Sequence, residues 1–355
     1  MEWKLSDEQD AYRRTLREWL ADVAPAATVR QWLDDADATT FEQRIARDGW
    51  TGVGIGEALG GQGGGLLELA LTSEELARTA VPSASWLANV LAIPALQGHA
   101  PLAERALAGE PVVLLASADQ LPDATPALPM DAKGRVSGTV DLVLAGDRAH
   151  SFIVVVSNEV GRQLRLVDRQ ADGVTITPRR LLDRSRSVAD VRLDQVAAEP
   201  LELDADSYLI ACTARAAVLT AADALGASER MLDLSVEYSL QRRQFGVPIG
   251  SFQAVKHAAA TMLVGIEAAR SVVYFAAASV DGDDPESFLH AAAVKAQVTA
   301  EAARAADSAL TVHGAIGYTW EHDLQLFSKR AKLDEHLYGD PVVWNERIAA
   351  GLALV

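Results

Sequence analysis

The sequence predicts an α+β protein in which a helical segment, a β-rich segment and a second helical segment follow one another. Three observations support this class. Apolar residues recur at helical spacing near the N-terminus, short β-branched runs occupy the middle, and long alanine-rich stretches occupy the last third. We expect an N-terminal helical domain over residues 1–110, a middle β-domain over 111–202 and a C-terminal helical bundle over 203–355.

Composition narrows the class of partner. The chain has 355 residues, a formal net charge of −17, 49% apolar and 23% charged residues, which is globular composition. Nucleic acids and anionic membranes require a basic face, so we exclude both as general partners, although a few local arginines can still hold an anionic cofactor. No apolar run approaches the roughly 18 residues of a membrane span and no signal peptide is apparent. We therefore expect a cytoplasmic protein.

The N-terminal segment carries a helix start and a glycine-rich loop. Ser6 precedes Asp7 and Glu8, a pattern typical of a capped helix with acidic groups at its positive end. The loop Gly54–Gly65 lacks both a preceding strand pattern and a Lys-Ser/Thr ending, so it does not match a phosphate-binding P-loop. We interpret it as a structural turn between helices.

The middle segment changes to the period of β-strands. Short runs separated by turn residues read PVVLLAS, GRVSGTVDLVLAG, SFIVVVS, QLRLVDR, GVTITP and SVADVRLDQV. No helical pattern separates them, which favours a compact β-domain over a parallel α/β sheet.

The last segment returns to four or five long helices, and the density of small residues permits close packing, as in a bundle. Its single cysteine, Cys212, lies in an apolar helical stretch, so a disulfide within the chain is impossible and a core position is expected. Cys/His spacing for a metal site is absent.

Two long motifs in this segment interrupt the helices. The first is ALGASERMLDLSVEYSLQRRQFGVPIGSFQAVKHAAATM, and the second is LTVHGAIGYTWEHDLQLFSKRAK. Together with ARDGWTGVGIGEALGGQGGG and LTSEELARTAVP near the start, they resemble the acyl-CoA dehydrogenase family over essentially the whole chain.

The resemblance implies a fold and an activity. It implies N-terminal helices, a middle β-domain and a C-terminal four-helix bundle, in subunits that form dimers or dimers of dimers with FAD at the interface. In this family a carboxylate removes an α-proton from an acyl-CoA while the flavin accepts the β-hydride.

The resemblance also implies cofactor-binding residues. By position Arg242 matches the family's arginine that holds the diphosphate of the neighbouring subunit's FAD, and a guanidinium fork suits phosphate oxygens. The remaining matched positions are Gln244, Phe245, Gln253, Thr311, Gly314, Ala315 and Gly317. Thr311 and Ala315 replace the more usual Gln and Gly, which changes the hydrogen bonding to be expected at these positions.

Other family positions are altered. The usual positions of the catalytic glutamate hold Tyr338 and Ala216, so no catalytic residue is assigned; Asp223, two turns beyond Ala216, is about 10.5 Å further along the helix. The Trp-x-Thr that contacts the flavin ring falls on Leu142 and Leu144, and leucine cannot donate a hydrogen bond.

The altered positions are those that would hold the ring of this subunit's own flavin and the base beside it, whereas the positions that would reach a partner's flavin are largely kept. Three interpretations follow. The chain is the base-lacking subunit of a heteromer that clasps a partner's FAD, resembling the degenerate subunits of actinobacterial sterol side-chain enzymes. Alternatively, it is an active homo-oligomer whose base is Asp340 or Glu335, or a CoA-thioester-binding scaffold without redox chemistry. His257 and His313 are interpreted as packing or interface residues.

Overall fold

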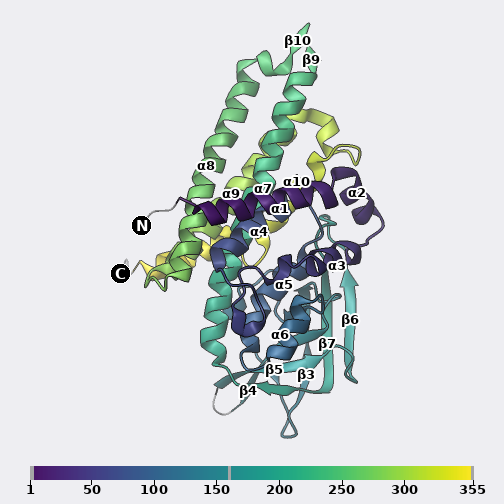
Figure 1. Cartoon of the computed structure of the whole chain (residues 1–355), viewed down its shortest axis with the longest axis vertical. Helices are drawn as coiled ribbons and strands as arrows, with labels where there is room; N and C mark the ends of the chain where they lie inside the picture. Colours follow the sequence, from purple (N-terminus) through teal and green to yellow (C-terminus); the bar gives the residue numbers. More distant parts are fainter. Residues whose placement is uncertain (1–3, 159–160, 353–355) are drawn as a thin grey trace. The chain divides into compact units, whose positions relative to one another are not determined.

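The computed structural model describes residues 4–158 and 161–352, and its elements follow the predicted order of helices, strands and helices (Figure 1). The first three residues of the N-terminal stretch lie outside the described range. The chain divides into two compact units, which are described separately. Unit 1 comprises Met1–Gln31, Leu69–Val81 and Ala217–Val355, and unit 2 comprises Trp32–Glu68 and Pro82–Ala216.

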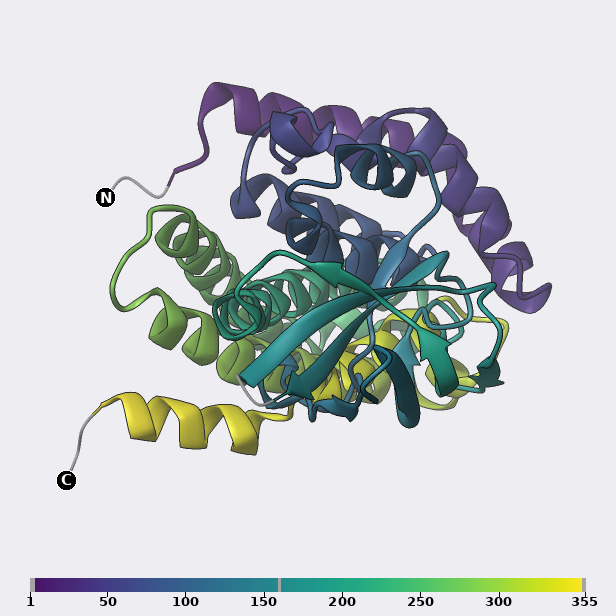
Figure 2. The ribbon, with the colours of Figure 1, turned by 90° about the horizontal axis from the view of Figure 1, so that it is seen from below.

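Unit 2 contains the predicted β-strands, shown in teal in Figure 2. All six predicted runs form strands, and two short strands, β2 and β8, were not predicted. The strands are β1 (Val112–Leu114), β2 (Leu128–Pro129), β3 (Arg135–Leu144), β4 (Ser151–Asn158), β5 (Gly161–Asp168), β6 (Val174–Arg179), β7 (Val188–Ala197) and β8 (Glu199–Leu201).

The strands form two sheets. One has the order β1-β4-β5-β8 with β2 also paired to β4, and the other has the order β3-β7-β6. The pairs β3–β7, β6–β7, β4–β5 and β5–β8 are antiparallel, whereas β1 and β2 pair with β4 in parallel. The first sheet is therefore mixed, which the strand pattern alone did not indicate.

Unit 2 also holds short helices. They are α3 (Thr39–Arg47), η1 (Trp50–Gly52), η2 (Glu57–Leu59), α5 (Ala84–Ala92), η3 (Ile93–Leu96), α6 (Ala100–Leu107) and η4 (Pro122–Ala124). Within the glycine-rich loop, Ile55 bridges Gly63, and a Cβ on Gly61 would lie 2.1 Å from the Ile55 carbonyl oxygen. Close backbone contact explains a glycine here, in agreement with the structural interpretation of the loop.

Unit 1 is helical. Its elements are α1 (Asp7–Val23), most of α2 (Ala26–Asp34) and α4 (Leu66–Arg78), the larger part of α7 (Ala205–Gln241), the hairpin β9 (Arg243–Gln244) and β10 (Val247–Pro248), η5 (Ile249–Ser251), α8 (Gln253–Asp281), α9 (Ser287–His313), η6 (Gly314–Tyr318), α10 (Leu324–His336) and α11 (Pro341–Gly351). Ser6 caps α1 as predicted, because its hydroxyl accepts from the Gln9 N–H and the Gln9 side chain accepts from the Ser6 N–H.

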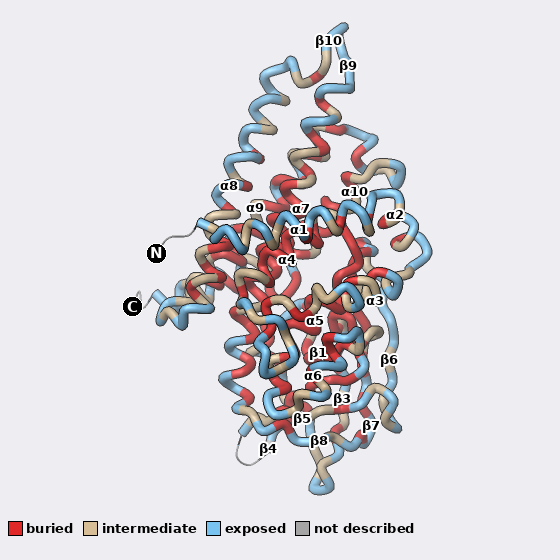
Figure 3. The backbone as a smooth tube through the Cα atoms, viewed as in Figure 1, coloured by how far each residue is buried: buried red, intermediate tan, exposed pale blue. Residues whose placement is uncertain are grey.

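Two long helices differ in burial. The helices α7 and α8 are each long and apolar enough to cross a membrane, judged by length and hydropathy alone. This corrects the expectation that no apolar run approaches the length of a membrane span. The most apolar window of α7 is 83% buried, against 39% for α8. Figure 3 shows α7 buried along most of its length and exposed at the end that leads into β9. Its apolar composition is that of a core helix.

The helices α4 and α7 of unit 1 meet at a buried carboxyl group. A Cβ on Gly226 would lie 2.0 Å from the carbonyl oxygen of Glu74, so only glycine permits this approach. The fully buried Glu74 side chain accepts a hydrogen bond of 2.8 Å from the Tyr274 hydroxyl. Burial, followed by the nearby carboxylates Glu229 and Glu75, raises the pKa of Glu74 to about 8.

We predict that this carboxyl group makes stability depend on pH. Because the folded-state pKa exceeds the unfolded value of about 4.3, the native state binds more protons between these values, and the free energy of unfolding falls as pH rises through this window. Glu74→Gln removes this dependence. The free energy of unfolding of the variant, relative to that of the wild type, should therefore rise by up to a few kcal/mol between pH 5 and pH 8. Urea unfolding at pH 5, 7 and 8 measures it, with the exposed Glu346→Gln as control.

A second buried group joins α7 to α10. The Arg330 guanidinium donates two hydrogen bonds to the Asp223 carboxylate, at 2.6 and 2.7 Å, and a third to the Val81 carbonyl at 3.0 Å. The two side chains of the ion pair are 0% and 2% exposed. Such a bidentate pair fixes both helices and engages both oxygens of the carboxylate.

Candidate functional site

The first motif forms the end of the helical hairpin α7–α8 (Figure 1). After α7, the strands β9 and β10 pair with Val247 opposite Gln244, and the turn between them has φ of +50° at Phe245 and +82° at Gly246. Two successive left-handed residues are typical of the tight turns that join antiparallel strands. The hairpin therefore presents its side chains on a defined backbone.

These side chains face solvent in the isolated chain. Arg242 is exposed, and among the described residues its guanidinium has no ion pair. Phe245 is 92% exposed, and its ring meets that of Phe252 edge-on at 6.1 Å. Gln244 and Gln253 are also exposed. An unpaired cation beside an uncovered aromatic ring is typical of a contact surface for an anionic ligand or another subunit.

The second motif forms the turn after α9. Gly314 has φ +66° and ψ −146°, a conformation open mainly to glycine, and the buried Gly317 has no room for a side chain because a Cβ would lie 3.0 Å from His313 and Leu324 atoms. The exposed Thr311 hydroxyl donates to the Asp307 carbonyl at 2.8 Å, so its hydrogen is already engaged within α9. Ala315 is exposed and offers no polar side-chain atom.

An aromatic cluster connects the two motifs within unit 1. Tyr238, one turn before Arg242, stacks on His313 with ring centroids 4.6 Å apart, and His322 meets His313 at 4.7 Å. The Nδ1 of His313 lies 2.8 Å from the Ala309 carbonyl, and burial lowers the pKa of both imidazoles. The cluster was not predicted, although Tyr238 opens the first motif. It brings the ends of α7 and α9 together.

The two histidines interpreted as packing or interface residues lie in different places. His313 is 4% exposed and packs in the cluster, whereas His257 is exposed on α8. No group of three or more His, Cys, Asp or Glu side chains able to hold a metal occurs in residues 4–158 and 161–352. Cys212 is buried, which raises the pKa of its thiol to about 12. The thiol therefore has little thiolate character for catalysis.

The usual positions of the catalytic base lie in packed surroundings. Tyr338 is 6% exposed with φ +56°, and its carbonyl accepts a hydrogen bond of 2.9 Å from the Trp344 indole. The buried Lys295 donates to the carbonyls of Gly339 at 2.9 Å and Asp334 at 3.0 Å, and burial lowers its pKa to about 7. The turn that carries Tyr338 is therefore held from two sides.

The nearby acids have structural partners. Asp340 caps α11, accepting from the N–H groups of Val342 at 2.9 Å and Val343 at 3.0 Å. Asp223 is held in the buried pair with Arg330, and Ala216 is 0% exposed on α7. Glu335 is half-buried near the end of α10.

In unit 2, Leu142 and Leu144 lie on β3. Leu142 has φ +56° at an irregularity between Val140 and Val143, and its N–H donates to the Asp190 carboxylate at 3.1 Å. Leu144 is 2% exposed and belongs to the apolar core. Neither side chain offers a hydrogen bond to a ring.

The chain has the order of elements of an α+β protein with an arginine-bearing hairpin between two long helices, and comparisons with known proteins identify its family. Two family profiles match: "Acyl-CoA dehydrogenase, N-terminal domain" over residues 6–106 and "Acyl-CoA dehydrogenase, C-terminal domain" over residues 207–353. Acyl-CoA dehydrogenase IpdE2 of Mycobacterium tuberculosis is 34% identical over 342 residues, covering 94% of both chains.

Two solved structures share the fold. The structure titled "Tcur3481-Tcur3483 steroid ACAD G363A variant" has a TM-score of 0.87 at 24% identity and covers 98% of both chains. A chain of the ChsE4-ChsE5 complex from Mycobacterium tuberculosis has a TM-score of 0.85 at 24% identity and covers 100% of both. The chain belongs to the acyl-CoA dehydrogenase family. The predicted family and fold are thereby confirmed.

Proposed function

We propose that this chain is the subunit of a heteromeric acyl-CoA dehydrogenase that carries no catalytic base and that clasps an FAD held mainly by its partner subunit. One observation carries the proposal. Arg242 is exposed on the β9–β10 hairpin and has no ion pair with any described residue, whereas both positions of the base hold residues without a carboxylate, Tyr338 and Ala216.

The residues of this chain fit an FAD unequally. The guanidinium of Arg242 provides parallel N–H donors for a diphosphate, and the turn leaves backbone accessible for a ligand at the exposed Gly314. Leu142 and Leu144, by contrast, offer nothing to the polar edge of a flavin ring. An FAD bound in this subunit would therefore find few hydrogen bonds for its ring. The side chains that would contact the FAD of a partner subunit are present.

When bound, FAD would supply the hydride acceptor for α,β-desaturation of an acyl-CoA thioester. This chain would neutralise the diphosphate through Arg242 and shield it with Phe245, while the partner would provide the carboxylate that removes the α-proton. The steroid enzyme among the structural relatives favours a bulky substrate, such as a sterol side-chain or branched acyl-CoA.

The alternative of an active homo-oligomer needs a relocated base. Asp340 would have to release two backbone N–H groups that it now caps, at a cost of about 1 kcal/mol or more. Glu335 lies near the end of a helix whose carbonyls are held by Lys295. Asp340 is thus better explained by a structural role, whereas Glu335 is held through its backbone carbonyl.

Flavin content tests the proposal. We expect the chain purified alone to hold almost no FAD, and the complex co-expressed with a partner acyl-CoA dehydrogenase subunit to hold about half a flavin per subunit, since only one of two subunits retains the ring contacts. Visible spectra with released-flavin quantification measure both. Near-stoichiometric FAD in the isolated chain would contradict the proposal, and a flavin-free complex would favour a CoA-thioester-binding scaffold.

A further inference from the structure

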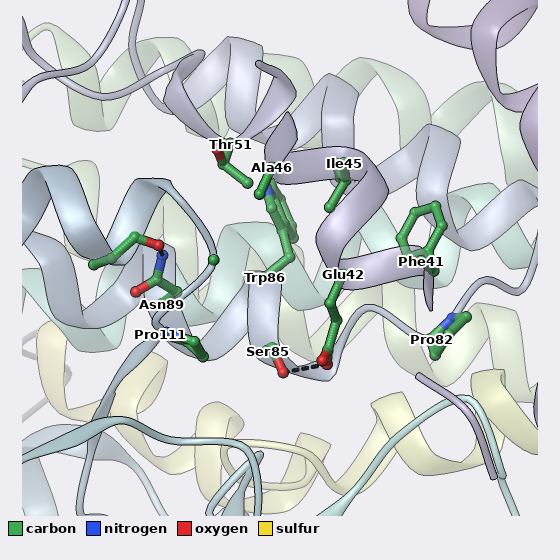
Figure 4. Close-up of a pocket in the computed structure, with 12 residues that line it drawn as sticks. Phe41, Glu42, Ile45, Ala46, Thr51, Pro82, Ser85, Trp86, Asn89 and Pro111 are labelled. Atoms are coloured by element: carbon green, nitrogen blue, oxygen red, sulfur yellow. Dashed lines mark hydrogen bonds between the residues drawn. The ribbon is translucent and has the colours of Figure 1, made fainter. Parts of the chain in front are cut away.

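Unit 2 contains a cavity between its helices α3, α5 and α6, which is drawn in Figure 4. The volume of this cavity is about 40 Å³. A cavity needs about 10–15 Å³ on this measure to hold one water molecule, so this one can admit a larger molecule. Close packing leaves few such voids in a protein interior. None of the residues that line it belongs to the hairpin, the second motif or the base positions.

The walls of the cavity are mainly apolar. Phe41, Ile45 and Ala46 of α3 contribute to one side, and Trp86 of α5 contributes to another. The lining also includes Pro82, Ala106, Gly109 and Pro111, of which Gly109 is exposed to solvent. A concave apolar surface with few polar groups is typical of a site for a small molecule, and the volume restricts that molecule to a few non-hydrogen atoms.

Two of the polar side chains in the lining already have hydrogen-bond partners. The Thr51 hydroxyl donates to the Leu107 carbonyl at 2.6 Å. The Asn89 side chain donates to the Ala106 carbonyl at 3.1 Å and accepts from the Val112 N–H at 3.0 Å. These bonds join α5 and η1 to the end of α6 and the start of β1, so we assign both side chains to the structure of the wall.

A carboxyl group also borders the cavity. Figure 4 shows the Glu42 carboxyl group joined to the Ser85 hydroxyl, which donates to it. A carboxyl group beside apolar walls makes the cavity unfavourable for an anion, because the anion would lose its hydration and meet a group of its own charge. We therefore expect an uncharged ligand.

The Trp86 indole N–H differs from these groups. Trp86 is 6% exposed, and its buried Nε1 has no hydrogen-bond partner among residues 4–158 and 161–352. Figure 4 shows the indole extending from α5 toward Ala46 of α3, with its nitrogen at that end. The indole nitrogen can only donate, and a buried donor without an acceptor costs free energy. Buried tryptophans usually find a partner for this N–H, so an acceptor is expected here.

We propose that this cavity binds a small uncharged carbonyl compound, whose oxygen accepts a hydrogen bond from the Trp86 indole N–H. The hydrocarbon part of the ligand packs against the apolar side chains of α3, Phe41 and Ile45. A short ketone has this combination of one acceptor and an apolar body. The ligand enters beside the exposed Gly109, where the lining reaches the protein surface.

The indole N–H signals of the full-length chain, labelled with nitrogen-15 tryptophan, test the site by NMR. The chain has seven tryptophans, and Trp86→Phe identifies the signal of Trp86 by its loss. The probes are 2-butanone and 2-methyl-1-butene, in which a methylene group replaces the carbonyl oxygen. Ala46→Leu fills the cavity and keeps the N–H, and Ala11→Leu at an exposed position of α1 is the matched control. Thermal melting reports the folding of each variant.

We expect 2-butanone to shift the Trp86 signal in a saturable way, in the wild type and in Ala11→Leu but not in Ala46→Leu. The hydrocarbon should bind about threefold to tenfold more weakly, because it cannot accept the hydrogen bond. No saturable shift of the Trp86 signal in the wild type, or equal binding of the two probes, overturns the proposal. This comparison of probes needs no variant to fold, and the flavin test above is independent of it.

Discussion

Replacing Asp223 with alanine is expected to lower the free energy of unfolding by about 3–5 kcal/mol, because it leaves the Arg330 guanidinium buried without its counter-ion. The hydrogen bond to the Val81 carbonyl is retained, but a carbonyl oxygen cannot neutralise the charge. Denaturant titration of the purified chain or complex measures the change.

The exposed pair of Asp307 and Lys332 provides the control for this experiment. Their side chains are 66% and 44% exposed, so Asp307→Ala should cost at most about 1 kcal/mol. A combined Asp223→Leu, Arg330→Met variant should recover much of the loss, because it removes the buried charge together with its partner. Equal losses in Asp223→Ala and Asp307→Ala would mean that the buried pair contributes no more than a surface one.

Replacing Arg242 with glutamine is expected to weaken FAD binding by the heteromeric complex about a hundredfold. Two charge-assisted hydrogen bonds to a diphosphate are lost, each worth at least about 1.5 kcal/mol, and each 1.4 kcal/mol corresponds to a factor of ten. Arg242→Lys should be intermediate, since an ammonium keeps the charge without the planar fork. Fluorescence titration of the flavin-depleted complex gives the affinities.

The neighbouring arginine is the matched control for the clasp. Arg243 donates to the Gly246 carbonyl at 3.2 Å and is not at the matched diphosphate position. Arg243→Gln should therefore retain FAD. A comparable loss in both variants would assign the effect to the fold of the hairpin or to general charge, and unchanged binding in Arg242→Gln would remove Arg242 from the site.

The local pattern of the sequence was a good guide to elements and a poor guide to their long-range partners. Alternating β-branched runs gave six strands, and Ser6 gave the start of α1, because both depend on neighbouring residues. The parallel pairing of β1 with β4 depends on how distant segments meet. The family resemblance, confirmed by the comparisons, supplied the class of protein, which periodicity could not.

The candidate site was likewise predictable where it depends on neighbouring residues and not where it depends on residues far apart in the chain. The first motif marked Arg242 and Phe245, and the hairpin presents both on its surface. The pairing of Asp223 with Arg330 is a contact between residues far apart in the chain. No local spacing identifies it. Tyr238 and His313 are also separated in sequence, so their stacking required the structure.

The discontinuous make-up of unit 1 has a consequence for synthesis on the ribosome. Unit 2 ends at Ala216, so all of its residues have been made while much of the chain is still to come, whereas Met1–Gln31 and Leu69–Val81 belong with Ala217–Val355. The helix α1 can meet α4 early, since Arg17 pairs with Glu75. At about 5–20 residues per second, both must wait on the order of ten seconds for the rest of unit 1. During that interval unit 1 is incomplete, so the nascent chain should depend on chaperones through these two early segments.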